Sequence, residues 1–305
     1  MAVSPRSTRL TGPSAPVARR MWSLYEPIHA VTYFAEESRA AADAAGYRGF
    51  WMGYCAMRAA PLGPVGPAAV TAAFFGFAPE RIARALPDAW EIAGTDLALQ
   101  ARLTGVDRAL RRLFGPDVVA SPSLARTAQL AAEAAAGANV AGRVLGAANQ
   151  VLPLPSQSHL ALWQALTTLR EHRGDGHIAA LVSAGVTPVQ SHLLKSAAGE
   201  APGDRLQQGR AWSDEAWETA KSELVVRGWL TDDGGLTEEG RRRKDDIEER
   251  TDAAAESPWT ALGPSRTEEL EALLIPLTAT IVESGLIPAI NPIGLPLQQI
   301  SGHNA

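Results

Sequence analysis

The chain has 305 residues, of which 46% are hydrophobic and 20% charged, and its formal net charge at pH 7 is −5. This composition is typical of a soluble globular protein with one large or two ordinary domains, and it gives no overall attraction to nucleic acid or anionic membranes. The single cysteine, Cys55, excludes an internal disulfide and a cysteine-rich metal site. Neither a membrane span nor a secretory signal is predicted, so we expect a cytoplasmic protein.

Helical periodicity dominates the chain from one end to the other. Residues 1–20, rich in Ser, Pro, Ala and Arg, predict a disordered tail, and 297–305 predict a second one. The first half predicts helices over 21–45, 49–59, 67–75, 79–85, 88–114 and 123–148. After a Pro-rich break, the second half predicts helices over 157–171, 176–184, 188–197, 213–227, 238–255 and 266–284.

One β-hairpin is predicted, in the second half. The segment RGWLTDDGGLTEEGR (227–241) has an Asp-Asp-Gly-Gly turn between apolar positions, which is a hairpin signal. Ser213 and Thr237 each precede acidic residues and are predicted to cap the helices that flank this hairpin.

The two halves of the chain resemble each other, which indicates an internal duplication. Four segments recur in the same order: 45–65 with 171–189, 87–93 with 214–220, 121–127 with 263–269, and 149–155 with 291–296. The offset between the matches grows across the predicted hairpin, so the first half has largely lost that element. We therefore predict two repeats, 21–155 and 156–296.

The stretch HRGDGHIAAL (172–181) is the first candidate site. Arg48-Gly49 occurs at the matching place in the first half, so Arg173-Gly174 is interpreted as a helix end and turn of the shared fold. Asp175 is then predicted as the N-cap of the next helix. His177 would fall in the first turn of that helix, where the dipole disfavours the charged ring. A base, a metal ligand and a core histidine all remain open for it.

The stretch YEPIHAVTYFAEE (25–37) is the second candidate. Tyr25, His29 and Tyr33 would recur along one face of a helix, with Phe34 beside them. This stripe is either part of an aromatic core or one wall of a pocket.

The second half also carries a family resemblance. Residues 213–243 resemble the second helix, wing and following helix of a MarR-like winged helix-turn-helix, and residues 20–296 are similar to actinobacterial tandem helix-turn-helix proteins often labelled SalK-like. The segments that carry this similarity are 25–37, 46–65, 172–181 and 227–252. The resemblance implies a mainly α fold of two tandem winged-helix-like units, a fused pseudo-dimer, with one short β-hairpin wing in the second half. No settled activity comes with it.

DNA recognition is disfavoured by the charges of the expected recognition helices. The second-half helix carries Asp214, Glu215, Glu218 and Glu223 against Lys221 and Arg227. Those carboxylates would face phosphates at close range. The equivalent first-half region, 87–103, is also acidic and lacks a wing.

The main hypothesis is a protein that binds or transforms a small aromatic or hydrophobic molecule in a cavity between the repeats, where MarR-like proteins bind aromatic ligands. The predicted ligand contacts are Tyr25, Tyr33, Phe34, Phe50, Trp51, Tyr54 and, mainly on the resemblance, Asp252. The predicted catalytic groups are His177, Asp175 and His29. In one subcase a haem or metal cofactor is bound, with His177 as its ligand.

Two other classes of function stay open. The first is a ligand-responsive, MarR-like transcriptional regulator that binds DNA. The second is a scaffold with no site, in which loss of either His177 or His29 would have no effect. No membrane partner is expected, and the chain is predicted to be a monomeric pseudo-dimer or a homodimer.

Overall fold

A computed structural model describes residues 15–295 and Leu297, and this part of the chain is mainly helical, as predicted. The first half forms α1 (Val17–Phe34), α2 (Glu36–Ala44), α3 (Gly49–Ala59), the 3-10 turn η1 (Ala60–Leu62), α4 (Pro67–Phe74), α5 (Pro79–Ala83), α6 (Asp88–Ile92), α7 (Thr95–Val119), α8 (Pro122–Ala136) and α9 (Val144–Gln150). The second half forms α10 (Ser158–Ser183), α11 (Pro188–Ala197), α12 (Gly203–Arg210), α13 (Asp214–Val226), α14 (Glu238–Ala254), α15 (Ser257–Leu262) and α16 (Pro264–Glu283).

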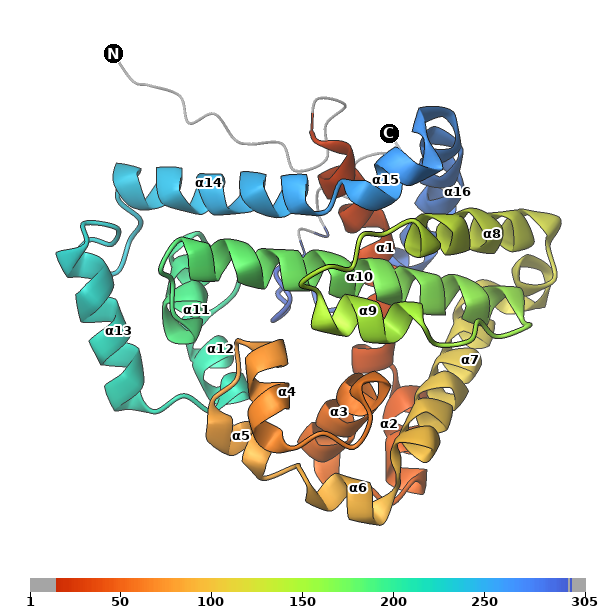
Figure 1. The fold of residues 1–305 in the computed structure, drawn as a ribbon, viewed down its shortest axis with the longest axis horizontal. Helices are drawn as coiled ribbons and strands as arrows, with labels where there is room; N and C mark the ends of the chain where they lie inside the picture. The colour runs from red at the N-terminus through yellow and green to blue at the C-terminus, as the bar shows by residue number, and fades with distance from the viewer. Residues whose placement is uncertain (1–14, 296, 298–305) are drawn as a thin grey trace.

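The long helix α10 is the spine of the molecule. Figure 1 shows it crossing the middle of the fold, with α14 beside its C-terminal half and α8 beside its N-terminal half. Its N-terminal half is buried on nearly all sides, and Trp163 and Leu166 pack in one core with Leu130 of α8 and Leu274 of α16. Helices from both halves of the chain therefore share a central hydrophobic core.

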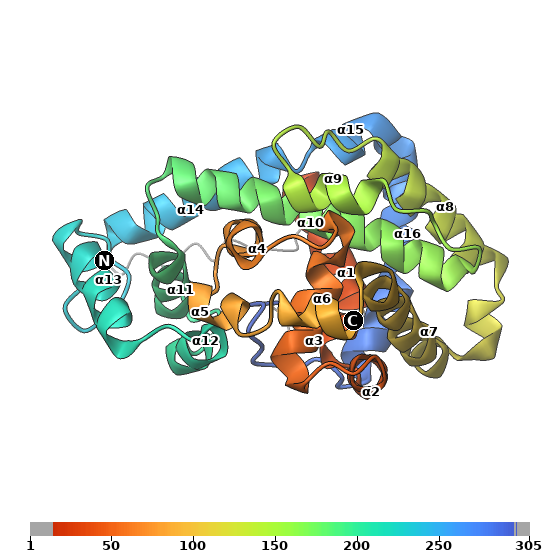
Figure 2. The same ribbon diagram turned by 60° about the horizontal axis from the view of Figure 1, so that its bottom comes forward.

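Each half also adds a lobe with a core of its own. Cys55, Phe74 and Leu86 belong to the core of the first lobe, which is built mainly by α2–α7. Leu193 and Leu224 belong to the core of the second lobe, built by the end of α10 and by α11–α14. Figure 2 shows α11–α13 of the second lobe and α2–α6 of the first lobe on the same side of α10, with α14 on the other side. Such an arrangement is what two fused units would produce, and the duplication itself stays a prediction.

The turn predicted at Arg173-Gly174 is wrong, because α10 runs through this stretch without a break. A side chain on Gly176 would overlap Arg143 Nη1 and lie 3.2 Å from Ala254 Cβ. The glycine therefore serves a close approach between helices. Tertiary packing overrides the local preference of a Gly-Asp-Gly sequence for a turn.

Substitution of the two glycines tests this interpretation. Gly174→Ala would place a Cβ 3.8 Å from Glu171 Oε2 with no closer neighbour, so we expect a gain of about 0.5–1 kcal/mol in the free energy of unfolding. Gly176→Ala would displace Arg143, which donates to the His172 carbonyl over 2.6 Å, and we expect a loss of about 1–3 kcal/mol. Urea denaturation measures both; a loss of stability in both variants would indicate a turn.

The predicted wing is present only as a tight loop. One isolated antiparallel bridge joins Leu230 and Leu236, and the described residues contain no strand. Thr231 and Asp233 hold the turn through the Gly235 amide, but α14 begins at Glu238 and leaves the arms too short for a ladder. The side chains of Ser213 and Thr237 cap α13 and α14, so both predicted caps are confirmed.

The N-terminal boundary also differs from the prediction. Helix α1 begins at Val17, so residues 17–20 belong to a packed helix and only 1–14 lie outside the described residues. Arg20 pairs with Glu271 of α16 over 2.9 Å, which anchors this helix end. The predicted C-terminal tail, apart from Leu297, lies outside the described residues. In the described part of the chain, every helix is too short or too polar to cross a membrane.

Candidate functional site

A cavity of about 370 Å³ opens between the two lobes. Its wall is formed by α1, α3, the segment 74–77, the C-terminal half of α10, α11 and α14. On one side of the cavity the two lobes are joined at the Gly76 carbonyl, which accepts hydrogen bonds from His192 Nε2 (2.7 Å) and Trp212 Nε1 (3.0 Å). The first lobe is thus attached to the second beside the cavity.

Aromatic rings form the first-lobe wall of this cavity. The ring of Tyr54 lies 5.6 Å from that of Trp51 and 5.5 Å from that of Phe77, and it also lies 5.2 Å from that of Tyr33. Phe50 completes this aromatic wall and is 42% exposed. Rings at these distances favour a flat apolar molecule laid against them.

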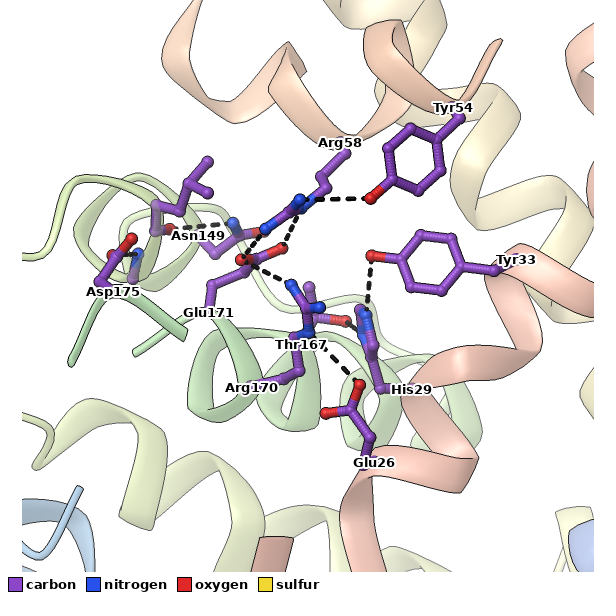
Figure 3. A network of polar contacts seen from close by, with 12 residues as sticks. Glu26, His29, Tyr33, Tyr54, Arg58, Asn149, Thr167, Arg170, Glu171 and Asp175 are labelled. Carbon is purple, nitrogen blue, oxygen red and sulfur yellow. Dashed lines mark hydrogen bonds and ion pairs between the residues drawn. The ribbon is translucent and has the colours of Figure 1, made fainter. Parts of the chain in front are cut away.

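Charged groups face the aromatic wall from α3, α10 and α1. Figure 3 shows Glu171 held by two arginines: Arg58 donates to it through Nε and Nη2, each over 2.9 Å, and Arg170 through Nη1 over 2.9 Å. Arg170 also pairs with Glu26 at 3.4 Å. Burial raises the pKa of the Glu171 carboxyl, but the positive charges of Arg170 and Arg58 lower it by more than burial raises it. The pKa therefore stays well below its usual range.

A third guanidinium, that of Arg210, lies near this network without a carboxylate of its own. It stacks over Phe77 at 4.3 Å and lines the cavity. Burial lowers its pKa, and the positive charges of Arg58 and Arg170 lower it further. The ion pairs and hydrogen bonds of the described residues give this guanidinium no partner.

His29 is fixed in a recess of about 40 Å³ beside the main cavity. Thr167 Oγ1 donates to the Trp163 carbonyl (2.8 Å), so it accepts from His29 Nδ1 (3.0 Å). His29 Nε2 then accepts the hydroxyl proton of Tyr33 over 3.1 Å. Both ring nitrogens are occupied, and burial lowers the pKa of His29 well below its usual range. The ring therefore orients Tyr33, whose own ring lies on the wall of both spaces.

His177 lies on the cavity wall with one nitrogen open. Thr251 Oγ1 donates to the Ile247 carbonyl (2.7 Å) and accepts from His177 Nδ1 (2.9 Å), so Nε2 carries the lone pair and has no hydrogen bond within the described residues. The predicted first-turn position is wrong, because His177 lies inside α10. Burial, rather than the helix dipole, lowers its pKa to about 4 and keeps it neutral.

The surroundings of His177 bear on the predicted haem. Charged groups surround this ring, namely Arg173, Lys195, Lys244 and Glu248. They differ from the apolar wall that axial ligation of a haem would favour. No cluster of three metal-ligating side chains occurs among the described residues. The surroundings of His177 therefore do not fit a haem or a metal ion.

Four of the predicted site residues lie outside the wall of the main cavity: His29, which lines the small recess, and Asp175, Tyr25 and Asp252. Asp175 is not an N-cap of its own helix; its carboxylate accepts from the Gly146 amide over 2.8 Å and so caps α9. Burial raises its pKa to about 6. Tyr25 is buried against Trp259 in the central core. Asp252 is buried in ion pairs with Arg19 and Arg173.

The remaining predicted residues lie together, as a shared site requires. Tyr33, Phe34, Phe50, Trp51, Tyr54 and His177 all line the main cavity. Residues from two helices of the first half and from the spine helix thus meet between the lobes.

The outer face of the second lobe has a helix-turn-helix arrangement. Helix α12 is followed by the short connection 211–213 and then by α13, whose N-terminus is capped by Ser213. The first-lobe segment that the predicted duplication would pair with α13 is shorter, since α6 extends only from Asp88 to Ile92. The exposed side of α13 carries the carboxylates of Asp214, Glu215, Glu218 and Glu223.

The sequence pattern of a helix-turn-helix family matches residues 18–288 of the chain. The chain belongs to this helix-turn-helix family. No curated protein matches the chain, and no solved structure does. The matched residues cover both lobes and most of the central core, and they include all of the cavity lining except Pro292, Ile293 and Gly294.

Sequence reasoning missed the charged part of the site in this helix-turn-helix protein. Glu171 and Arg170 directly precede the stretch 172–181, but nothing local shows that Arg58 lies against them. Arg210 ends α12, a helix that the periodicity did not predict. The one available signal was the adjacent Arg170 and Glu171 at the end of a mainly apolar helical stretch, where charged side chains are uncommon.

Proposed function

We propose that this helix-turn-helix protein binds a small, flat, mainly aromatic molecule in the cavity between its lobes. The observation that carries the proposal is the cavity itself, whose volume of about 370 Å³ lies in the range of small-molecule sites. Aromatic rings cover one wall, while the opposite wall offers a few fixed polar groups, including the open Nε2 of His177. This combination supports ligand binding.

A fluorescent ligand and a pair of tryptophan variants test the proposal. Ile178 lines the cavity, while Val182, one turn later on α10, is 61% exposed and lies outside its wall. We expect the neutral probe N-phenyl-1-naphthylamine to bind the unaltered protein at one site per chain. Ile178→Trp fills the space and should weaken this binding by about tenfold or more, while Val182→Trp should not change it.

Fluorescence titration gives the dissociation constants, and near-ultraviolet circular dichroism checks that each variant is folded. A protein that takes up no probe would remove the proposal. So would an Ile178→Trp variant that binds the probe as tightly as the unaltered protein, because the probe would then occupy another place.

DNA binding is the second candidate, and membership of the helix-turn-helix family supports it more directly than it supports ligand binding. Thr219 and Ser222 are exposed on α13 and have side chains able to contact bases or phosphates. The neighbouring carboxylates of Glu218 and Glu223 oppose this role, since they would meet phosphates without a gain from counterion release.

A binding assay on DNA separates the two candidates. On this second candidate, DNA from upstream of the protein's own gene should bind at about 50 mM salt and lose most of its affinity at about 200 mM. The double variant Thr219→Ala, Ser222→Ala should bind it less selectively. Fluorescence anisotropy measures both effects, and an absence of binding at low salt would leave ligand binding alone.

A further inference from the structure

The cationic side of the cavity is unbalanced in charge. Arg58, Arg170 and Arg210 lie close enough for their charges to affect one another. The first two share the carboxylates of Glu171 and Glu26. In the described residues Arg210 has no such partner. The cluster therefore holds one positive charge more than its acids neutralise.

Arg210 has a guanidinium that lines the cavity and makes no ion pair within the described residues, so it is available to a ligand. Its backbone carbonyl accepts from the Ala78 amide over 3.0 Å, so the main chain is fixed to the first lobe at the cavity's edge. Its guanidinium carbon lies over the Phe77 ring, 4.3 Å from the ring centre, and its N–H groups make no hydrogen bond within the described residues, so they are available to a molecule in the cavity. A guanidinium held in this way is a strong donor to a planar anion.

The other groups nearby fit the same ligand. Tyr54 accepts a hydrogen bond from Arg58 Nη1 over 3.2 Å, so its hydroxyl proton is free to point into the cavity. Lys195 also lines the wall, and its one hydrogen-bond partner among the described residues is the Ile293 carbonyl, at 2.7 Å. Both groups favour negative charge on a bound molecule, and the aromatic wall favours an apolar body.

We infer that the ligand is an anion: a flat aromatic molecule with one negatively charged group that binds Arg210. This inference rests on the proposed function and adds the charge of the ligand and the residue that recognises it. The shared chemistry is that of a carboxylate or sulfonate attached to a ring system.

Two probes with the same ring skeleton test the inference. The first is the anion 8-anilino-1-naphthalenesulfonate, and the second is the neutral N-phenyl-1-naphthylamine, which lacks the sulfonate. We expect the unaltered protein to prefer the anion. Arg210→Met should weaken binding of the anionic probe by about tenfold to a hundredfold and change binding of the neutral probe less than about twofold. Arg210→Lys should restore much of the preference.

The matched control is Arg205→Met, because Arg205 is exposed on the same helix and lies outside the cavity wall. It should leave both probes unaffected. Equal binding of the anionic probe by Arg210→Met and the unaltered protein would overturn the inference, and so would an equal loss of both probes. Uptake of the neutral probe alone would retain the proposed function while the inference failed, and uptake of neither would remove both.

Discussion

Glu171→Ala should cost about 3–5 kcal/mol of the free energy of unfolding, since it leaves buried guanidinium groups without their carboxylate. Glu171 is 1% exposed and joins Arg58 of α3 to Arg170 of α10. Arg170 would retain only the longer contact with Glu26. Urea denaturation followed by circular dichroism at 222 nm measures the change.

Two further variants make this test specific. Glu171→Gln keeps the hydrogen-bonding shape but loses the charge, so its stability should lie between those of the alanine variant and the unaltered protein. Glu269 pairs with Arg126 on the surface, and Glu269→Ala should have little effect because exposed ion pairs contribute little. If the alanine variants of Glu171 and Glu269 were equally stable, the buried network would not hold the lobe to the spine.

Mild acid should unfold the protein, and this is the second large effect. Burial lowers the pKa of His172 to about 4, of His177 to about 4 and of His192 to about 3, and it holds that of His29 well below its usual range. The unfolded chain takes up these protons near pH 6.5, so protonation favours unfolding as the pH falls from about 6.5 to 4.

The size of the loss follows from these shifts. One pKa unit corresponds to about 1.4 kcal/mol, so His172, His177 and His192 each remove about 3 kcal/mol by pH 4, and His29 acts in the same direction. Burial raises the pKa of Asp175 to about 6, so the folded state binds this proton more tightly than the unfolded chain does. Protonation of Asp175 therefore increases the free energy of unfolding as the pH falls over the same range. This gain offsets about one histidine. The net loss is comparable with the whole stability of an ordinary domain.

Urea denaturation at pH 7, 6 and 5 checks this expectation, together with the loss of helical circular dichroism down to pH 4. His192→Gln keeps a donor for the Gly76 carbonyl but does not titrate, so it should shift the unfolding midpoint to lower pH. A free energy of unfolding that is the same at pH 7 and pH 5 would show that the buried histidines do not control acid stability.

Much of the secondary structure follows from local sequence. The predicted helices over 49–59 and 188–197 have the observed bounds of α3 and α11. Ser213 and Thr237 cap their helices because a side-chain oxygen within a few residues satisfies free amides, which needs no distant partner. The aromatic wall was also visible, since Phe50, Trp51 and Tyr54 lie within one short helix.

The tertiary structure alone decided the course of α10 and the charge of the cavity. A glycine at position 176 signals a turn locally, but the structure uses it to let Arg143 and Ala254 approach the helix. Arg58 and Glu171 are far apart in the sequence, and only the fold brings the end of α3 close enough to α10 for them to pair. Helix propensity, periodicity and capping act within a few residues, so the sequence determined the helices and the aromatic wall. Close approach and ion pairing depend on how distant segments meet. The continuous spine, the cap that Asp175 gives α9 and the position of Arg210, which has no acidic partner among the described residues, therefore had to come from the fold.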